Sequence, residues 1–304
     1  MNEARYREVE QQLWASVGIS PTERRVPLAC TGTTVRVQVV GDGEPVLFLH
    51  GAPNAGSTWA PIIPHFAGYR CLIVDRPGTG LSDDFQLTRN IAPVADRFLG
   101  DLLDALDVPR AHIVASSFGG FLALRSAAAT PDRIDRMVQM SCPALAPGMT
   151  VPPVMRGLSN PFICWLAPKL PPSKGYNLRV LRDLGHGASL DGHRIPDLFH
   201  DWYLALQRHT PLMRNEIALI AAAISGKGID QATALDANVL SRVQAPTLFL
   251  WGEADGFGGP DVARGVTAAM PNASLELFPG FGHLPWMDDP DQMGARTVAF
   301  LRGN

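Results

Sequence analysis

The chain has 304 residues, of which 46% are hydrophobic and 18% charged, and its formal net charge is −3. These values exclude a disordered chain, and the lack of a basic block excludes nucleic acid and anionic membranes as expected partners. The charged N-terminus lacks a signal-peptide core, no apolar run is long enough to span a membrane, and the four cysteines are scattered. We therefore expect a cytoplasmic globular protein with reduced thiols.

Short apolar segments alternate with longer amphipathic ones along most of the chain. Residues 1–16 predict an accessory helix, which packs on the body or forms an oligomer contact. The pattern predicts strands at 34–40, 46–49, 70–74, 112–115, 137–141, 247–251 and 274–278, and helices at 92–106, 117–130 and 291–302. This alternation predicts an α/β fold, with a mostly parallel central sheet flanked by helices and its chemistry at the carboxyl ends of the strands.

The middle of the chain departs from this alternation. It is rich in proline from residue 143 to 172, and helix-like segments follow near 176–184, 197–209 and 212–225. We predict a helical cap at 143–238, inserted between the two parts of an α/β core, 1–142 and 239–304. The aromatic residues of this region are interpreted either as packing residues or as an apolar roof on a substrate pocket. The candidate pocket residues are Phe162, Trp165 and Trp202 of the cap and Trp286 of the core.

Three cap histidines, His186, His193 and His200, are spaced seven residues apart. On one continuous helix they would share a face, but Gly192 and Pro196 interrupt any such helix. No further residues with ligand spacing accompany them, so we expect neither a metal site nor a cofactor.

The segment HIVASSFGG, residues 112–120, holds two adjacent serines between a predicted strand and a predicted helix. A serine on such a tight turn is exposed as a nucleophile, and small residues are needed two positions before it and two after it. Ala115 and Gly119 satisfy this requirement for Ser117, whereas Ser116 would be flanked by bulky residues. We therefore predict Ser117 as the nucleophile, with helix capping as the alternative role, and the Phe118 N–H as an oxyanion donor.

Three further segments provide partners for this serine. The loop HGAPNAG after the strand at 46–49 can present a second oxyanion donor, the Ala52 N–H. The alternative is that this loop only connects a strand to a helix. His283 lies in a glycine-flanked loop near the C-terminus, where it serves as the base or is merely solvated. Asp255 follows the strand at 247–251 and is the preferred orienting acid, with Glu253 as the alternative. The chain order serine, acid, histidine is that of one class of hydrolase.

Together these segments resemble the α/β-hydrolase family over nearly the whole chain after residue 25. The matching motifs are His50-Gly51, Asp75-Arg76-Pro77-Gly78-Thr79-Gly80-Leu81-Ser82, Ser117-Phe118-Gly119-Gly120, Trp251-Gly252-Glu253-Ala254-Asp255 and Gly282-His283. The resemblance implies a Ser117–His283–Asp255 triad with oxyanion donors at Ala52 and Phe118. Family members usually have glycine where this chain has Ala115. Members that open epoxides or cleave carbon–halogen bonds use an aspartate nucleophile, which Ser117 argues against.

The expected function is that of a serine hydrolase that cleaves a carboxylic ester of a small, apolar acyl substrate through an acyl-enzyme. Hydrolysis of carbon–carbon bonds in aromatic ring-cleavage products, or of lactones, is the alternative. In the carbon–carbon hydrolases the loop histidine is often followed by tryptophan, whereas Leu284 follows His283 here. A ligand-binding protein without catalytic activity is a further alternative, since a fold does not prove catalysis. The sequence makes no prediction of the oligomeric state.

Overall fold

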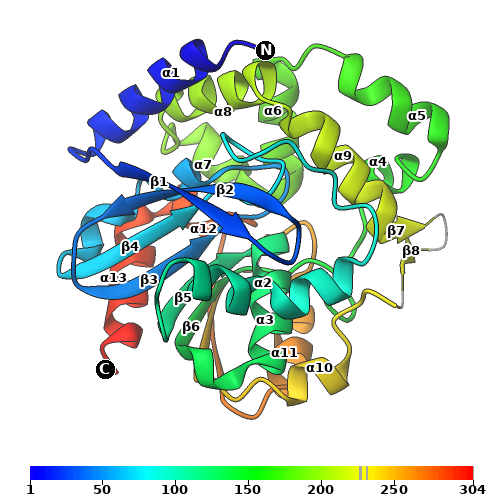
Figure 1. Ribbon diagram of the computed structural model, residues 1–304. Helices are drawn as coiled ribbons and strands as arrows, with labels where there is room; N and C mark the ends of the chain where they lie inside the picture. The colour runs from blue at the N-terminus through cyan, green and yellow to red at the C-terminus, as the bar shows by residue number, and fades with distance from the viewer. Residues whose placement is uncertain (226–227, 231, 304) are drawn as a thin grey trace.

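The structure, a computed structural model, describes residues 1–225, 228–230 and 232–303. Its main sheet has eight strands in the order β1-β2-β4-β3-β5-β6-β9-β10. β2 is antiparallel to both of its neighbours, β1 and β4, and all other neighbouring strands are parallel, which confirms the predicted mostly parallel sheet (Figure 1). The strands are β1 (Thr22–Leu28), β2 (Thr33–Val40), β3 (Glu44–Leu49), β4 (Tyr69–Val74), β5 (Ala111–Ser116), β6 (Ile134–Met140), β9 (Thr247–Gly252) and β10 (Ala273–Phe278).

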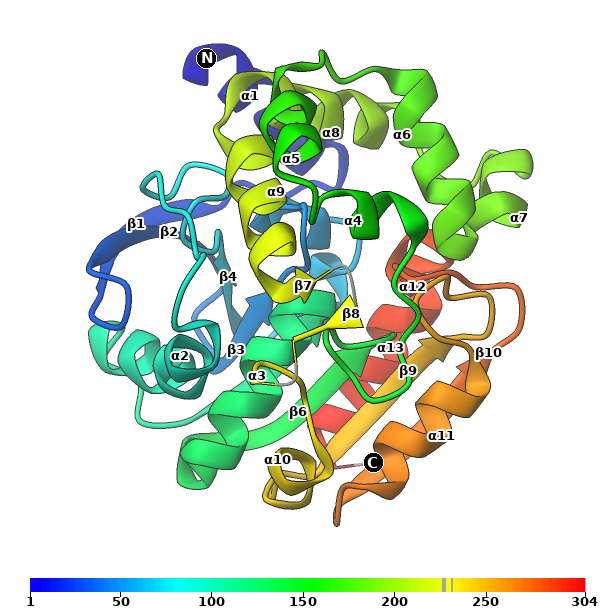
Figure 2. The same cartoon turned by 90° about the vertical axis from the view of Figure 1, so that its right-hand side faces the viewer.

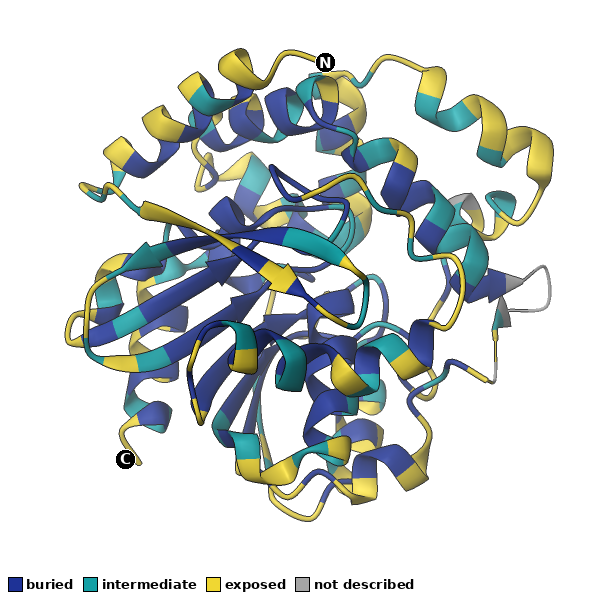
Figure 3. Ribbon diagram, viewed as in Figure 1, coloured by how far each residue is buried: buried dark blue, intermediate teal, exposed yellow. Residues whose placement is uncertain are grey.

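Two apolar cores lie on opposite faces of this sheet, because successive side chains of a strand point to opposite sides. In β3, Leu47 and Leu49 enter the core formed with α2 and α3, whereas Val46 and Phe48 enter the core formed with α1 and α13. Figure 3 shows the central strands buried over most of their length. The helices of these layers are α1 (Glu3–Ser16), α2 (Ile91–Ala105), α3 (Ser117–Ala129), α10 (Ala237–Ser241), α11 (Pro260–Ala268), α12 (Pro285–Asp288) and α13 (Pro290–Leu301).

Between β6 and β9 the chain is mainly helical. All helices of this stretch except α10 lie together above the sheet in both ribbon views, and we call this part the cap segment (Figures 1 and 2). The helices of this cap segment are α4 (Pro153–Gly157), α5 (Pro161–Leu166), α6 (Lys174–Leu181), α7 (Gly187–Asp191), α8 (Asp197–His209) and α9 (Leu212–Ala223). A π-helical turn, Arg182–His186, joins α6 to α7, and a short hairpin of β7 (Ile224–Ser225) and β8 (Gly228–Ile229) follows α9. Among the described residues, no helix is both long and apolar enough to cross a membrane.

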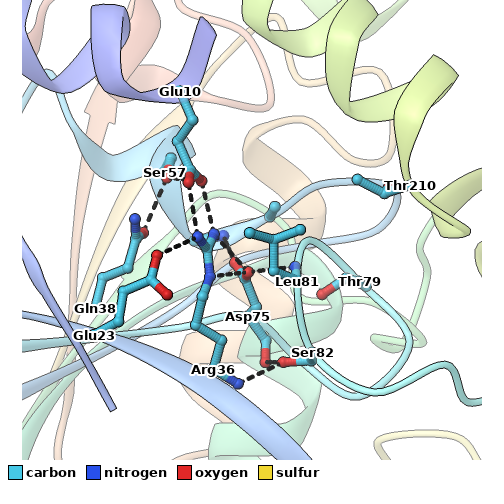
Figure 4. A network of polar contacts seen from close by, with 12 residues as sticks. Glu10, Glu23, Arg36, Gln38, Ser57, Asp75, Thr79, Leu81, Ser82 and Thr210 are labelled. Carbon is cyan, nitrogen blue, oxygen red and sulfur yellow. Dashed lines mark hydrogen bonds and ion pairs between the residues drawn. The ribbon is translucent and has the colours of Figure 1, made fainter. Parts of the chain in front are cut away.

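A buried ionic network ties α1 to the sheet (Figure 4). The guanidinium of Arg36 on β2, with no exposed surface, donates to Glu10 of α1 at 2.7 Å and to Asp75 at 2.7 Å. Burial alone would lower the pKa of Arg36, but the carboxylates of Asp75 and Glu10 outweigh it and hold that pKa well above its ordinary value. Asp75 also accepts hydrogen bonds from the amides of Gly56 and Leu81, so the network fixes the loops after β3 and β4.

Candidate active site

A tight turn joins β5 to α3 and carries Ser117. Its φ angle is +51°, a left-handed conformation that side-chain-bearing residues rarely adopt and that is typical of functional sites. The turn packs closely against the end of β3: a Cβ on Gly119 would lie 2.2 Å from the Leu49 carbonyl oxygen, and one on Gly51 would lie 2.7 Å from the Ser117 Cβ. Glycine at both positions is therefore a steric requirement. Ser116 is fully buried on β5, whereas Ser117 lines a pocket.

The pocket beside Ser117 lies between the core and helices α4 and α9. None of the described residues that line it is charged. They are Ala52, Ser117, Phe118, Cys142, Ala144, Leu145, Met149, Met155, Leu219, Ile220, Ala223, Ile224 and Phe257. A second cavity shares Phe118 and Leu219 with the first, so these two side chains form the wall between them.

His283 and Asp255 form a pair, and neither side chain lines this pocket. The His283 Nδ1 lies 2.9 Å from the Asp255 Oδ2, and both side chains are almost completely buried. The same carboxylate accepts from the amides of Cys142 at 3.0 Å and Phe257 at 2.8 Å, so its position is fixed from three sides. His283 Nε2 is buried, and no described residue forms a hydrogen bond with it. Phe257 links the pair to the pocket, because its ring lies edge-on to the imidazole, with 4.6 Å between centroids.

The loop after β3 carries Ala52 at the pocket, and hydrogen bonds to the peptide unit between Gly51 and Ala52 hold it there. The Gly51 carbonyl accepts from His50 Nδ1 at 2.7 Å and from Arg76 at 2.9 Å. Because a peptide unit is planar, holding this carbonyl also fixes the direction of the Ala52 N–H in the same unit. Arg76 is in turn paired with Glu216 of α9 at 2.8 Å, and both side chains are buried. The cap segment thus contacts this loop through a buried ion pair.

His50 is neutral in this arrangement. Its Nε2 accepts a hydrogen bond from the Arg76 backbone N–H at 3.2 Å, so the proton is on Nδ1 and faces the Gly51 carbonyl. Burial lowers the pKa of His50 well below its ordinary value, and the charge of Arg76 lowers it further. Neither Arg76 nor His50 was assigned this role from the sequence, although both lie in the motifs quoted above.

Acidification should destabilise the protein through His50. Below about pH 6.5 the unfolded chain binds a proton that the folded chain excludes, so stability that is present above this pH is lost as the pH falls toward the folded-state pKa. The loss is about 1.4 kcal/mol per pH unit for one proton. Denaturant unfolding at about pH 7 and about pH 5.5 measures it. In His50→Gln, which keeps an amide donor, the stability lost between these two pH values should be smaller than in the wild type by about 1.4 kcal/mol for each pH unit below about 6.5. Equal losses of stability in the two proteins would contradict a neutral His50.

The structure corrects the predicted substrate pocket, because none of the four aromatic residues is among those that line it. Phe162 and Trp165 lie on α5, which has no buried residue (Figure 3). Their side chains are 65% and 60% exposed. Trp202 is fully buried on the face of α8 that packs in the same core as α1. Trp286 is fully buried against Trp59, with ring centroids 4.2 Å apart. The pocket is lined instead mainly by small and aliphatic residues, with Phe118 and Phe257, and their spacing in the sequence does not distinguish them from core residues.

The cap histidines also have different roles. His186 is fully buried and bonds to Asp288, which lies 102 residues further along the chain. His193 is exposed, and His200 is buried on α8. No group of three or more histidine, cysteine or acidic side chains that could hold a metal ion occurs within residues 1–225, 228–230 and 232–303.

The chain belongs to the α/β-hydrolase fold family, whose sequence profile matches residues 44–290. The family and the curated relatives together identify the chain as a hydrolase. It is 28% identical to a 2-hydroxy-6-oxononadienedioate/2-hydroxy-6-oxononatrienedioate hydrolase of Burkholderia vietnamiensis, over 93% of this chain and 96% of that one.

Two solved structures share the fold. Naproxen esterase (carboxylesterase NP) from Bacillus subtilis superimposes with a TM-score of 0.72 at 18% identity, covering 98% of this chain and 97% of the esterase. The 2-hydroxy-6-oxo-6-phenylhexa-2,4-dienoate hydrolase of a Rhodococcus species gives a TM-score of 0.74 at 19% identity, covering 93% and 99% of the two chains. These likenesses establish the fold and do not choose between ester and carbon–carbon substrates.

Proposed function

We propose that the chain is a serine hydrolase with Ser117 as nucleophile, His283 as general base and Asp255 as its orienting acid. The observation that carries this proposal is the buried Asp255–His283 pair, whose second ring nitrogen has no described partner, Ser117 included. Phe257, which contacts both members of the pair, lines the same pocket as Ser117 on its strained turn. In the proposed reaction His283 Nε2 takes the proton of Ser117 as its oxygen attacks a carbonyl carbon. The Ala52 and Phe118 N–H groups stabilise the oxyanion, and Phe118 is suited to this because it lies in the first turn of α3.

The acyl-enzyme then forms and is hydrolysed with the same groups. His283 returns the proton to the leaving oxygen, so the bond between the carbonyl carbon and the leaving group breaks. Water, deprotonated by His283, attacks the acyl carbon; the bond to the Ser117 oxygen breaks, His283 returns the proton to that oxygen, and the acid is released. No residue besides these is needed to balance protons in either half of the reaction.

For the substrate, we propose an uncharged carboxylic ester. The described lining of the pocket has no charged side chain, and a carboxylate bound there would lose its hydration without gaining a cationic partner. The second candidate is carbon–carbon hydrolysis of a ring-cleavage dienoate. It is favoured by the names of curated relatives, of which one from Burkholderia cepacia is a 2-hydroxy-6-oxo-6-phenylhexa-2,4-dienoate hydrolase. Leu284, where those enzymes often have tryptophan, weighs against it.

A direct comparison of two substrates tests this choice. We expect kcat/KM for p-nitrophenyl butyrate to exceed that for 2-hydroxy-6-oxo-6-phenylhexa-2,4-dienoate, since only the latter brings a carboxylate into the pocket. Release of nitrophenolate and loss of the dienoate chromophore measure the two rates, and Ser117→Ala supplies the background for each. A faster reaction with the dienoate would establish the second candidate instead.

The wall between the two cavities should set the acyl length that the enzyme accepts. Leu219 contributes to both cavities and Ile220 only to the one beside Ser117. Leu219→Ala should therefore join the cavities and shift the preference among p-nitrophenyl esters toward longer acyl chains, at a stability cost of about 2–5 kcal/mol. Ile220→Ala is the matched control, because it widens the first cavity without opening the second. The same chain-length profile in both variants would contradict this role of Leu219.

A further inference from the structure

The π-helical turn Arg182–His186 of the cap segment lies between the two loops that carry Asp255 and His283. Three glycines allow this approach. A Cβ on Gly185 would lie 2.0 Å from the Ala254 carbonyl oxygen, and one on Gly256 would lie 2.3 Å from the Asp183 carbonyl oxygen. A Cβ on Gly282 would lie 2.7 Å from the Leu184 carbonyl oxygen. Real Cβ atoms do not come this close to a main-chain oxygen, so the contact between cap and core depends on glycine on both sides.

Hydrogen bonds hold three successive amides of the His283 loop. The Gly282 N–H donates to Asp288 Oδ2 at 2.8 Å. The His283 N–H donates to the Leu184 carbonyl at 2.9 Å, and the Leu284 N–H donates to His186 Nε2 at 3.1 Å. The cap segment supplies two of these three acceptors. The backbone on both sides of the His283 side chain is therefore fixed by groups outside its own loop.

His186 is held in one orientation and one tautomer. Its Nδ1 lies 3.0 Å from Asp288 Oδ1, which also accepts from the Ser189 hydroxyl, and the side chains of His186 and Asp288 have no exposed surface. Because Nε2 accepts from the Leu284 N–H, the ring proton is on Nδ1 and is donated to Asp288. Both ring nitrogens are thus used, and neither is available for proton transfer at the pocket.

We infer that His186 is a positioning residue for the general base, through which the cap segment aligns His283 with Ser117. The inference rests on the proposed triad. A general base acts only within hydrogen-bond reach of the proton that it takes, and a displacement of about 1 Å costs on the order of 100-fold in rate. Asp255 fixes one ring nitrogen of His283, and the direction of the ring then depends on the backbone at 282–284. His186, Asp288 and Leu184 set that backbone.

The test compares three single variants of the full chain. His186→Leu keeps an apolar side chain of moderate size and removes both hydrogen bonds, whereas His186→Gln keeps a donor and an acceptor on adjacent atoms. His193→Asn is the matched control, because His193 is an exposed cap histidine with a positive φ angle, which asparagine tolerates. Each variant is first shown to be folded by its circular dichroism and thermal transition, and rates are measured well below that transition.

We expect kcat for an ester to fall by about 10- to 100-fold in His186→Leu with little change in KM, and to recover substantially in His186→Gln. The rate constant for labelling of Ser117 by a fluorophosphonate should fall in parallel, and the downfield proton resonance of the Asp255–His283 hydrogen bond should shift or broaden. His193→Asn should match the wild type in all three. A folded His186→Leu that is labelled at the wild-type rate would overturn the inference, as would a loss of stability with kcat unchanged. A wild-type protein that is not labelled would instead overturn the proposed triad, whatever the variants do.

Discussion

Replacement of Ser117 by alanine should lower kcat for the best substrate by about 10⁵- to 10⁶-fold, while the protein stays folded. The expected loss is large because in the proposed mechanism the serine, the base and its acid act as one unit, so without the nucleophile the Asp255–His283 pair has no proton to take. Alanine also has a Cβ, so the left-handed backbone at position 117 is equally strained in the variant, and its melting temperature should stay close to that of the wild type. Steady-state hydrolysis and thermal unfolding of the same preparation measure both.

Ser116→Ala is the control for that experiment, because it removes the same atom one residue earlier. The Ser116 hydroxyl is fully buried on β5, with no hydrogen-bond partner among the described residues. Its loss should leave kcat within a few-fold of the wild type. An inactive Ser116→Ala beside an active Ser117→Ala would place the nucleophile one position earlier and refute the assigned register.

The second large effect concerns stability and the network in Figure 4. Arg36→Met should lower the free energy of unfolding by about 3–5 kcal/mol, because it leaves the buried carboxylates of Glu10 and Asp75 without their cation. Burial raises the pKa of Asp75 even with Arg36 present, so the variant should take up protons on these carboxylates when it folds. Denaturant unfolding at neutral pH measures the difference in unfolding free energy between the wild type and Arg36→Met. This difference should become smaller as the pH is lowered toward the range where both carboxylates are neutral.

Arg5→Met provides the comparison at the surface of the same helix. Arg5 pairs with Glu8 at 2.6 Å, and both side chains are more than half exposed. An exposed pair of this kind contributes at most about 1 kcal/mol, so this variant should unfold close to the wild type. Similar losses from Arg36→Met and Arg5→Met would show that burial of the α1 network does not matter for stability.

The strands and the serine turn could be predicted because their signals are local. β3, β5 and β9 are buried on both faces, so each is a short, continuous apolar run bounded by turn residues. The position of Ser117 followed from the size of its neighbours at Ala115 and Gly119, which is a property of nine consecutive residues. β1 was missed because five of its seven residues are exposed and it contains Pro27, which an edge strand tolerates and a central strand does not.

The lining of the pocket could not be predicted, because it depends on which way each cap helix faces. Trp165 and Trp202 are equally apolar in sequence, yet one lies in solvent on a six-residue helix and the other is fully buried on α8. The positions of His186 and Glu216 depend on contacts with Asp288 and Arg76, which lie 102 and 140 residues away. No periodicity or spacing within one segment carries that information.

The glycines at the contact between cap and core set a limit on recombination with related enzymes. Gly185 belongs to the cap segment, whereas Gly256 and Gly282 belong to the loops after β9 and β10. A chimera that places a foreign cap on this core would have to bring a residue without a Cβ at position 185 and main-chain oxygens where Asp183 and Leu184 have theirs. The cap segment therefore cannot be exchanged by itself. A functional chimera would have to exchange it together with the loops after β9 and β10.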